Sequence, residues 1–262
     1  MLRSVRKMRY ALVILTLACP LHGQRPSEAE AHALIERART TALRYNASLP
    51  DFICTQVVHR FQDPRRNGRW QSLDVLTVRL SYAGRREDYK LVEINGKPTL
   101  LDYMNTEGPT SKGEFGTLLL LLFHPDIQTE FRWKGWTTIR KQRAAVFSYK
   151  VDRAHSQFEV RYGAVDQGPN DIIVPYYGEV AFLPESGDVL RVSQHAVLPL
   201  NFAIKESSGE VEYDYTEVGG RRFLLPVSAE ILMATSRYKT RNFVEFKDYR
   251  KFQTETTITF DK

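Results

Sequence analysis

The side chains that could do chemistry are few, and they form no recognisable catalytic or metal-binding pattern. The chain has no His-Glu-x-x-His motif, no Gly-x-Ser-x-Gly nucleophile elbow, no phosphate-binding glycine loop and no Cys-x-x-Cys pair. Beyond residue 23 its histidines are far apart in sequence and lack ligand-type neighbours at metal spacing; they are His32, His59, His124, His155 and His195. The sequence therefore predicts no catalytic residues, no metal site and no cofactor.

Two carboxylate pairs are the remaining candidates for acid–base chemistry. Glu210 and Glu212 lie two residues apart in an alternating, strand-like run, so they should share its wet face. General acid catalysis needs at least one carboxyl group in a dry pocket, which a solvated strand face does not supply. A hydrolase built on Glu245, Asp248 or a histidine, with a site that only folding would assemble, remains open as a third hypothesis, behind the two given below. His195 is the histidine considered for such a site, although its sequence context favours a half-buried strand position.

The composition is that of a globular protein. The 262 residues are 42% hydrophobic and 26% charged, with 15 Gly, 12 Pro and two Cys. These proportions exclude a disordered chain, a collagen-like repeat, a multispan membrane protein and a disulfide-stapled miniprotein. A net charge of +6, from 37 Lys and Arg against 31 Asp and Glu, would suit a nucleic-acid partner if it lay in the folded protein.

Four of these cations lie instead in the first 23 residues, which contain no acidic residue. A basic start followed by an apolar run of about ten residues is typical of a secretory signal peptide, cleaved here after Gly23. The run is too short for a membrane span, which needs about 20 residues. Removal of residues 1–23 leaves 33 − 31, or +2. We therefore expect an exported protein with no nucleic-acid partner and no transmembrane span in the mature chain.

The two cysteines bear on how the mature protein begins and on whether it has a disulfide. Leu17-Ala18-Cys19 resembles a lipobox, so a lipid anchor at Cys19 competes with simple cleavage after Gly23. Either route places the protein in the periplasm or at the outer membrane. Cleavage after Gly23 leaves Cys54 as the sole thiol, which excludes an internal disulfide. Cys54 lies in an apolar, strand-like run, which indicates a small buried side chain rather than a nucleophile.

The mature sequence begins with one helix and continues as strands. Ser27 and Glu30 form a capping box, and apolar residues then recur at helical spacing over about 28–46. From Phe52 onward the period is two, and about eleven strands follow with one dry and one wet face. Dipeptides rich in glycine separate the runs; they are Asn67-Gly68, Asn95-Gly96, Ser186-Gly187, Ser208-Gly209 and Gly219-Gly220. No linker divides residues 24–262, which predicts a single domain.

One insertion interrupts the strands. A second capping box, Ser111 to Glu114, opens a segment that is apolar on nearly every side and ends before His124-Pro125. The spacing predicts a short helix over 112–123 that is buried on most sides, as the plug or lid of a curved sheet. The apolar residues in and after it are the candidate ligand-binding side chains, namely Leu118, Leu121, Phe123, Trp133 and Trp136.

The order of elements resembles the LolA/LolB-like superfamily of periplasmic lipoprotein carriers. The resemblance lies in the strand, glycine turn and strand progression of five segments, which are Tyr177–Phe182, Glu185–Arg191, Val211–Tyr215, Phe223–Pro226 and Phe246–Phe252. It covers roughly residues 28–260 in architecture and is shared with uncharacterised secreted bacterial proteins. The resemblance implies an α+β, mostly β fold, in which an unclosed barrel holds acyl chains on its concave face under helical lids.

The leading hypothesis is accordingly a non-enzymatic, exported binding protein. It would hold a lipid, a lipoprotein acyl chain or another apolar ligand in the concave face of the sheet. The second hypothesis is a structural or interaction protein of the cell envelope, with a filled core, no ligand and protein partners. A void of several hundred Å3 inside the sheet would separate the two.

Overall fold

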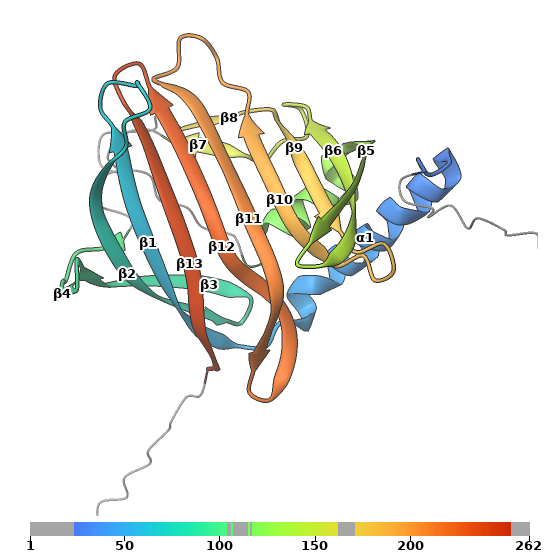
Figure 1. Cartoon of the computed structure of the whole chain (residues 1–262), viewed down its shortest axis with the longest axis horizontal. Coiled ribbons are helices and arrows are strands. Elements are labelled where there is room, and N and C mark those ends of the chain that lie inside the picture. Colours follow the sequence, from blue (N-terminus) through green and yellow to red (C-terminus); the bar gives the residue numbers. More distant parts are fainter. Residues whose placement is uncertain (1–23, 104–105, 107–114, 116, 162–170, 253–262) are drawn as a thin grey trace, which may run out of the picture.

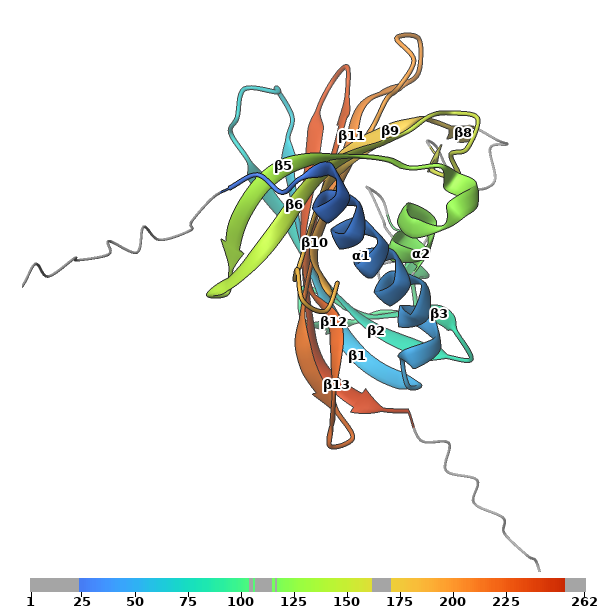
Figure 2. The same cartoon turned by 90° about the vertical axis from the view of Figure 1, so that its right-hand side faces the viewer.

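An eleven-stranded antiparallel sheet curves around two helices (Figures 1 and 2). The computed structural model describes residues 24–103, 106, 115, 117–161 and 171–252. The predicted signal peptide, Cys19 and the second capping box, Ser111 to Glu114, lie outside these ranges. In chain order the elements are α1 (Glu28–Ser48), β1 (Phe52–Asp63), β2 (Gln71–Ala83), β3 (Arg86–Ile94), β4 (Lys97–Pro98), α2 (Thr117–Phe123), the 3-10 helix η2 (Pro125–Ile127), β5 (Glu130–Ile139), β6 (Gln142–Val151), β7 (Glu159–Arg161), β8 (Asp171–Ile173), β9 (Tyr176–Phe182), β10 (Val189–Ala196), β11 (Ile204–Val218), β12 (Arg221–Thr235) and β13 (Lys239–Lys251).

The strand order explains why the sheet is curved but open. It runs β4-β3-β2-β1-β13-β12-β11-β10-β9-β6-β5, so most strands pair with their neighbours in sequence. The exceptions are β1 with β13 and β6 with β9. The two end strands, β4 and β5, do not pair with one another among the described residues, and β7 and β8 form a separate small hairpin. The fold is therefore mostly β with an unclosed barrel, as the sequence predicts.

Alternation along each strand separates two faces. On β1 the even-numbered residues Phe52, Cys54, Gln56 and Val58 are buried, whereas the residues between them are partly exposed. We call the buried side the inner face; α1 crosses it, with α2 alongside (Figure 2). The opposite side is the outer face. Cys54 is buried on the inner face, as expected of a small core side chain.

The turns mostly follow the predicted chemistry. Asn95 and Gly96 both have positive φ, as do Gly219 and Gly220, which is what a tight type I′ hairpin requires. The prediction of a turn at Ser208-Gly209 is wrong, because both residues lie inside the continuous strand β11. Glycine is tolerated there because Gly209 pairs normally with Ile231 in the long β11–β12 ladder.

Helix α1 confirms the predicted N-terminal helix and extends it to Ser48. The capping box is formed, since Glu30 N–H donates to Ser27 Oγ at 3.3 Å and Ser27 N–H donates to a Glu30 carboxylate oxygen at 2.8 Å. Tyr45 donates from its hydroxyl to the carbonyl of Leu224 at 2.8 Å, which ties the helix to β12. None of the helices in the described ranges is both long and apolar enough to cross a bilayer.

Within the predicted 112–123 segment the structure describes helix α2 over Thr117–Phe123, and its only polar residue is Thr117. Leu119, Leu122 and Phe123 are buried, whereas Leu118 and Leu121 are partly exposed and pack against the main core. Phe115, just before the helix, is fully buried between Phe52 and Phe246, with ring centroids 5.3 Å from each. Apart from Thr117 the helix is therefore apolar, but one side of it is not completely covered.

Candidate functional site

Aromatic rings line the inner face of β5, β6 and β9. Phe123 of α2 stacks on Phe131 of β5 with centroids 5.4 Å apart. Along the neighbouring strands, Phe147 stacks on Phe182 at 5.6 Å. These rings, together with the tryptophans below, form what we call the aromatic cluster, made of Phe123, Phe131, Trp133, Trp136, Phe147, Tyr149 and Phe182.

A bulge brings two tryptophans to the same side of β5. The register shifts between Trp133 and Gly135, so Trp136 falls on the same face as Trp133, although residues three positions apart on a regular strand point to opposite faces. Their centroids are 4.9 Å apart in an edge-to-face arrangement, and Trp133 also meets Phe147 at 5.2 Å. Both indoles are half-buried at the edge of the sheet. The tryptophan pair is thus a part of the aromatic cluster that a ligand could reach.

Polar contacts hold Trp136 in place. Its Nε1 donates to the carbonyl of Gln24 at 3.1 Å, just before α1. The Arg143 guanidinium lies 3.7 Å from the centroid of the indole, a cation–π contact. This side chain is therefore oriented before any ligand arrives.

The structure brings the predicted ligand residues together only in part. Phe123, Trp133 and Trp136 all belong to the aromatic cluster. Leu118 and Leu121 lie on the partly exposed side of α2, where they pack on the main core. The sequence reasoning did not place Phe131, Phe147, Tyr149 and Phe182 among the ligand residues. The alternation of residues 147–151 nevertheless predicts that Phe147 and Tyr149 share the dry face of one strand.

Tyr149 shows how the strands of the cluster are fitted to one another. Its hydroxyl reaches across β9 and donates to the carbonyl of Ser193 on β10 at 2.7 Å. Gly178 leaves the space that this hydrogen bond needs, because a Cβ at position 178 would lie 1.8 Å from the Ser193 oxygen and 2.9 Å from the Tyr149 hydroxyl. Burial, with a smaller contribution from Tyr176, raises the pKa of Tyr149 well above its ordinary value. The phenol therefore stays neutral, and the cluster carries no charge at this point.

In the buried ion pair identified on the inner face, the two opposite charges cancel. Arg60 of β1 donates two hydrogen bonds of 2.6 Å to the two carboxylate oxygens of Asp74 on β2. Such a bidentate pair leaves no net charge to attract an ionic ligand. The pair therefore adds no net charge to the inner face beside β1 and β2.

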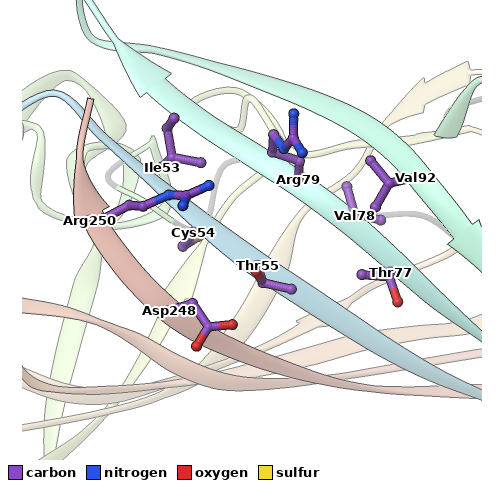
Figure 3. A pocket seen from close by; sticks show the side chains of 9 residues that line it. All are labelled: Ile53, Cys54, Thr55, Thr77, Val78, Arg79, Val92, Asp248 and Arg250. Atoms are coloured by element: carbon purple, nitrogen blue, oxygen red, sulfur yellow. The ribbon is translucent and has the colours of Figure 1, made fainter. Parts of the chain in front are cut away.

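Two hollows lined by described residues open on the outer face. The first, of about 110 Å3, lies over β1, β2 and β13 (Figure 3). Thr55, Thr77, Arg79, Asp248 and Arg250 border it. It forms where the β1–β13 register shifts, at a bulge in which Asp248 has a φ of +56°. Its volume is below the roughly 300 Å3 of a pocket for a drug-sized ligand.

The second hollow, of about 260 Å3, is bordered by acidic residues of β11 and β12 and by Phe243. Glu210 and Glu230 face each other directly across these strands, an unfavourable pairing of like charges. The pKa of Glu210 is raised above its ordinary value, and burial is the largest cause. The charge of Arg191 acts to lower this pKa, whereas Glu212 and Glu230 act to raise it further. Glu210 and Glu212 share the outer face, as the sequence predicts.

The candidate hydrolase residues lie on this same outer face. Glu245 has a half-exposed side chain, with its carboxylate 3.7 Å from Nε2 of His59, and Asp248 is exposed. Neither carboxyl group is in a dry pocket of the kind that general acid catalysis requires. His195 is exposed and stacks on Tyr177 with centroids 5.2 Å apart, whereas the sequence suggested a half-buried strand position. In the described ranges, no three His, Cys, Asp or Glu side chains come together as metal ligands.

Comparison with known proteins finds likeness in structure only. No protein-family model matches the chain, and neither does any curated protein sequence. Among solved structures, a LolA superfamily protein from Nitrosomonas europaea is similar to it, with a TM-score of 0.38 and 8% identity over 86% of this chain and 94% of that one. A DUF1329 family protein from Desulfovibrio piger has a TM-score of 0.39 and 7% identity over 86% and 95%.

A third similar structure is a putative outer membrane lipoprotein-sorting protein domain from Vibrio parahaemolyticus. Its TM-score is 0.36, with 12% identity over 87% of this chain and 95% of that one. The identities of all three are below 25% and their TM-scores below 0.5, so the function of this chain has to rest on its own residues.

Proposed function

We propose that this chain is a non-enzymatic binding protein that holds an apolar ligand, such as a lipid or an acyl chain, on the inner face of its open sheet. The aromatic cluster carries the proposal. It presents half-buried indole rings at the edge strand β5, where the sheet is not closed. Large aromatic surfaces at the mouth of a curved sheet are suited to apolar ligands.

Helix α2 supports the proposal from the other side. Its seven residues, Thr117–Phe123, contain no charged side chain, and Leu118 and Leu121 remain partly exposed next to the main core. A helix that is apolar all round normally needs cover on every side. A bound acyl chain lying against these leucines would supply the missing cover.

The proposed setting is the cell envelope. It is supported by residues 1–23, whose basic start and short apolar run match an export signal. The mature protein would be periplasmic or attached to the outer membrane, with Cys19 as the anchoring residue in the second case.

The second candidate is an interaction protein of the envelope with a filled core and a protein partner. The observation that favours it is the dense packing of the inner face, where Phe52, Phe115, Phe182 and Tyr213 are completely buried. Both hollows described above lie on the outer face, which also fits a scaffold whose partner binds outside.

Native mass spectrometry of residues 24–262, purified from cells and followed by lipid extraction, separates the two candidates. The binding protein should carry lipid, and after delipidation it should take up a fluorescent fatty acid saturably. Trp136→Ala should weaken that uptake, whereas Trp70→Ala, in the β1–β2 loop, should leave it unchanged. A protein that is free of lipid and has no measurable affinity for the fatty acid would refute the proposal.

A further inference from the structure

Gln56 is a polar side chain in the middle of the apolar inner face. It lies on β1, between Cys54 and Val58 on the same face of the strand. In the sheet it pairs with Val78 of β2 on one side and Phe246 of β13 on the other. Its exposed fraction is 0%. The amide is therefore held away from water among apolar and sulfur-containing neighbours.

Neither end of this amide is satisfied. Both Oε1 and Nε2 of Gln56 are buried, and neither has a hydrogen-bond partner among the residues that the structure describes. A glutamine amide can donate two hydrogen bonds and accept two. Leaving such a group unpaired in the interior is costly, and an apolar side chain of the same shape would be more stable there. A buried amide with no internal partner points to a polar group that arrives from outside the chain.

The chemistry of Gln56 indicates what that group is. The amide is uncharged and presents a donor and an acceptor side by side, so it matches a neutral group that also donates and accepts. The nearest charge on the inward side of β1 is that of Arg60, two inward positions away, and Asp74 of β2 neutralises it. This pair therefore offers no net counter-charge to an anionic or cationic head at Gln56.

Gln56 lies within reach of the apolar cover of the inner face. Its cross-strand neighbour Phe246 is in edge-to-face contact with Phe115, at a centroid distance of 5.3 Å, and Phe115 immediately precedes the α2 region. An apolar chain that enters beside α2 would bring its polar end to this position.

We propose that Gln56 binds the polar head of the ligand, and that this head is a neutral hydrogen-bonding group such as an amide or a hydroxyl. The inference rests on the proposed function, because it presupposes an apolar ligand on the inner face. It adds a preference for neutral amphiphiles over both hydrocarbons and charged lipids.

Three probes with the same twelve-carbon chain test this preference: dodecanamide, dodecanoate and dodecane. Each competes with one fluorescent alkyl probe for the delipidated protein of residues 24–262. The wild type should bind dodecanamide about tenfold or more tightly than dodecane, the effect of one or two net hydrogen bonds. Dodecanoate should gain no such advantage.

Gln56→Leu removes both hydrogen-bonding atoms and should reduce the preference for dodecanamide to about onefold, while dodecane binds as before. Gln56→Met makes the same change without branching, in case leucine disturbs the packing. Gln71→Leu makes it at an exposed position of β2 and should have no effect.

The outcomes separate two kinds of failure. If the wild type binds dodecane and dodecanamide equally, or if Gln56→Leu retains the preference, the role of Gln56 is refuted and the proposed function stands. A higher melting temperature of Gln56→Leu with unchanged preferences would mean that the amide only holds buried water, which also refutes it. If no alkyl probe binds at all, the proposed function itself fails.

Discussion

At Gly187 the backbone of the β9–β10 turn touches the backbone of α1. A Cβ at this position would lie 2.6 Å from the carbonyl oxygen of Arg37 and 2.9 Å from the Cα of Ala38. The residue also has a φ of +78°, in the left-handed region. Thr41 fastens the same turn by donating from its hydroxyl to the Ser186 carbonyl at 2.7 Å. A glycine at position 187 is thus needed for the β9–β10 turn to pack directly against the backbone of α1.

We predict that Gly187→Ala destabilises the protein by about 1–3 kcal/mol more than the conformational penalty alone, because α1 or the turn must shift. Gly220→Ala is the matched control. It has the same φ of +78° but nothing within 4 Å of an added Cβ, so it should cost about 1–2 kcal/mol. Urea unfolding of the two variants measures the difference. Equal losses would mean that the contact between the turn and α1 contributes nothing.

Asp63 organises the β1–β2 loop through its carboxylate. Backbone N–H groups of Arg65, Asn67 and Gly68 donate to it at 3.2, 3.2 and 2.7 Å. Burial acts to raise the pKa of Asp63, but the backbone donors together outweigh it, so the pKa is lowered. A lowered pKa means that the ionised carboxylate stabilises the fold above its unfolded pKa of about 3.9, and that this contribution is lost as the pH falls through the folded pKa.

Asp63→Asn should therefore be less stable than wild type at pH 7, and the difference should shrink as the pH is lowered below about 4. Thermal unfolding between pH 7 and pH 2.5 measures this trend. Glu185→Gln, an exposed position, should change neither the stability nor its pH dependence by a comparable amount. A stability difference for Asp63→Asn that does not depend on pH would contradict the role of the charge.

At this scale the sequence predicts which face a residue occupies better than it predicts what the residue meets. The period of two that begins at Phe52 places Cys54 correctly on a dry face. The same alternation also buries Gln56, but its lack of partners depends on β2 and β13 as its neighbours, and β13 is about 190 residues away along the chain. The sequence predicts only part of the aromatic cluster for the same reason. The rings of β6 and β9 meet only because these two strands, which are not consecutive in sequence, pair in the sheet.

Among the elements, α2 shows the closest link between stability and the proposed function. Leu119 is fully buried, and its neighbour Leu118 is partly exposed at the edge of the same core. The two side chains are chemically identical, so they separate the structural contribution of the helix from its contact with a ligand.

Leu119→Ala should lower the free energy of unfolding by about 2–5 kcal/mol, because it leaves a cavity in the core. Leu118→Ala should cost about 1 kcal/mol or less of stability but should weaken binding of the fluorescent fatty acid several-fold. Urea unfolding and a fluorescence titration of both variants make the test. Normal fatty-acid binding by Leu118→Ala would remove α2 from the proposed site.

The sequence predicts elements well where the signal is local. The capping box at Ser27 and the glycine turns at Gly96 and Gly220 rest on contacts within a few residues, and all are present. The false turn at Ser208-Gly209 arose because glycine has the same local preference in a turn and at an undemanding strand position. What decides between them is the long β11–β12 ladder, a feature that no short window contains.

At the scale of the whole molecule, β5 lies at an edge of the open sheet, where no further described strand pairs with its backbone. Exposed charged side chains such as Arg132 and Lys134 lie on this strand, which discourages edge-to-edge aggregation. The inward side of the same strand carries Phe131 and the two tryptophans. One strand therefore combines a protected edge with the most accessible part of the aromatic cluster.

Quenching of tryptophan fluorescence by a brominated fatty acid tests the central claim most directly, because bromine quenches only on close contact. The chain has three tryptophans, and Trp70→Phe leaves only the pair on β5. The proposed site predicts saturable quenching of Trp133 and Trp136 by a bromostearate, and recovery of the fluorescence when unlabelled stearate competes. Absence of saturable quenching in Trp70→Phe, with the protein shown to be folded, would contradict binding at the aromatic cluster.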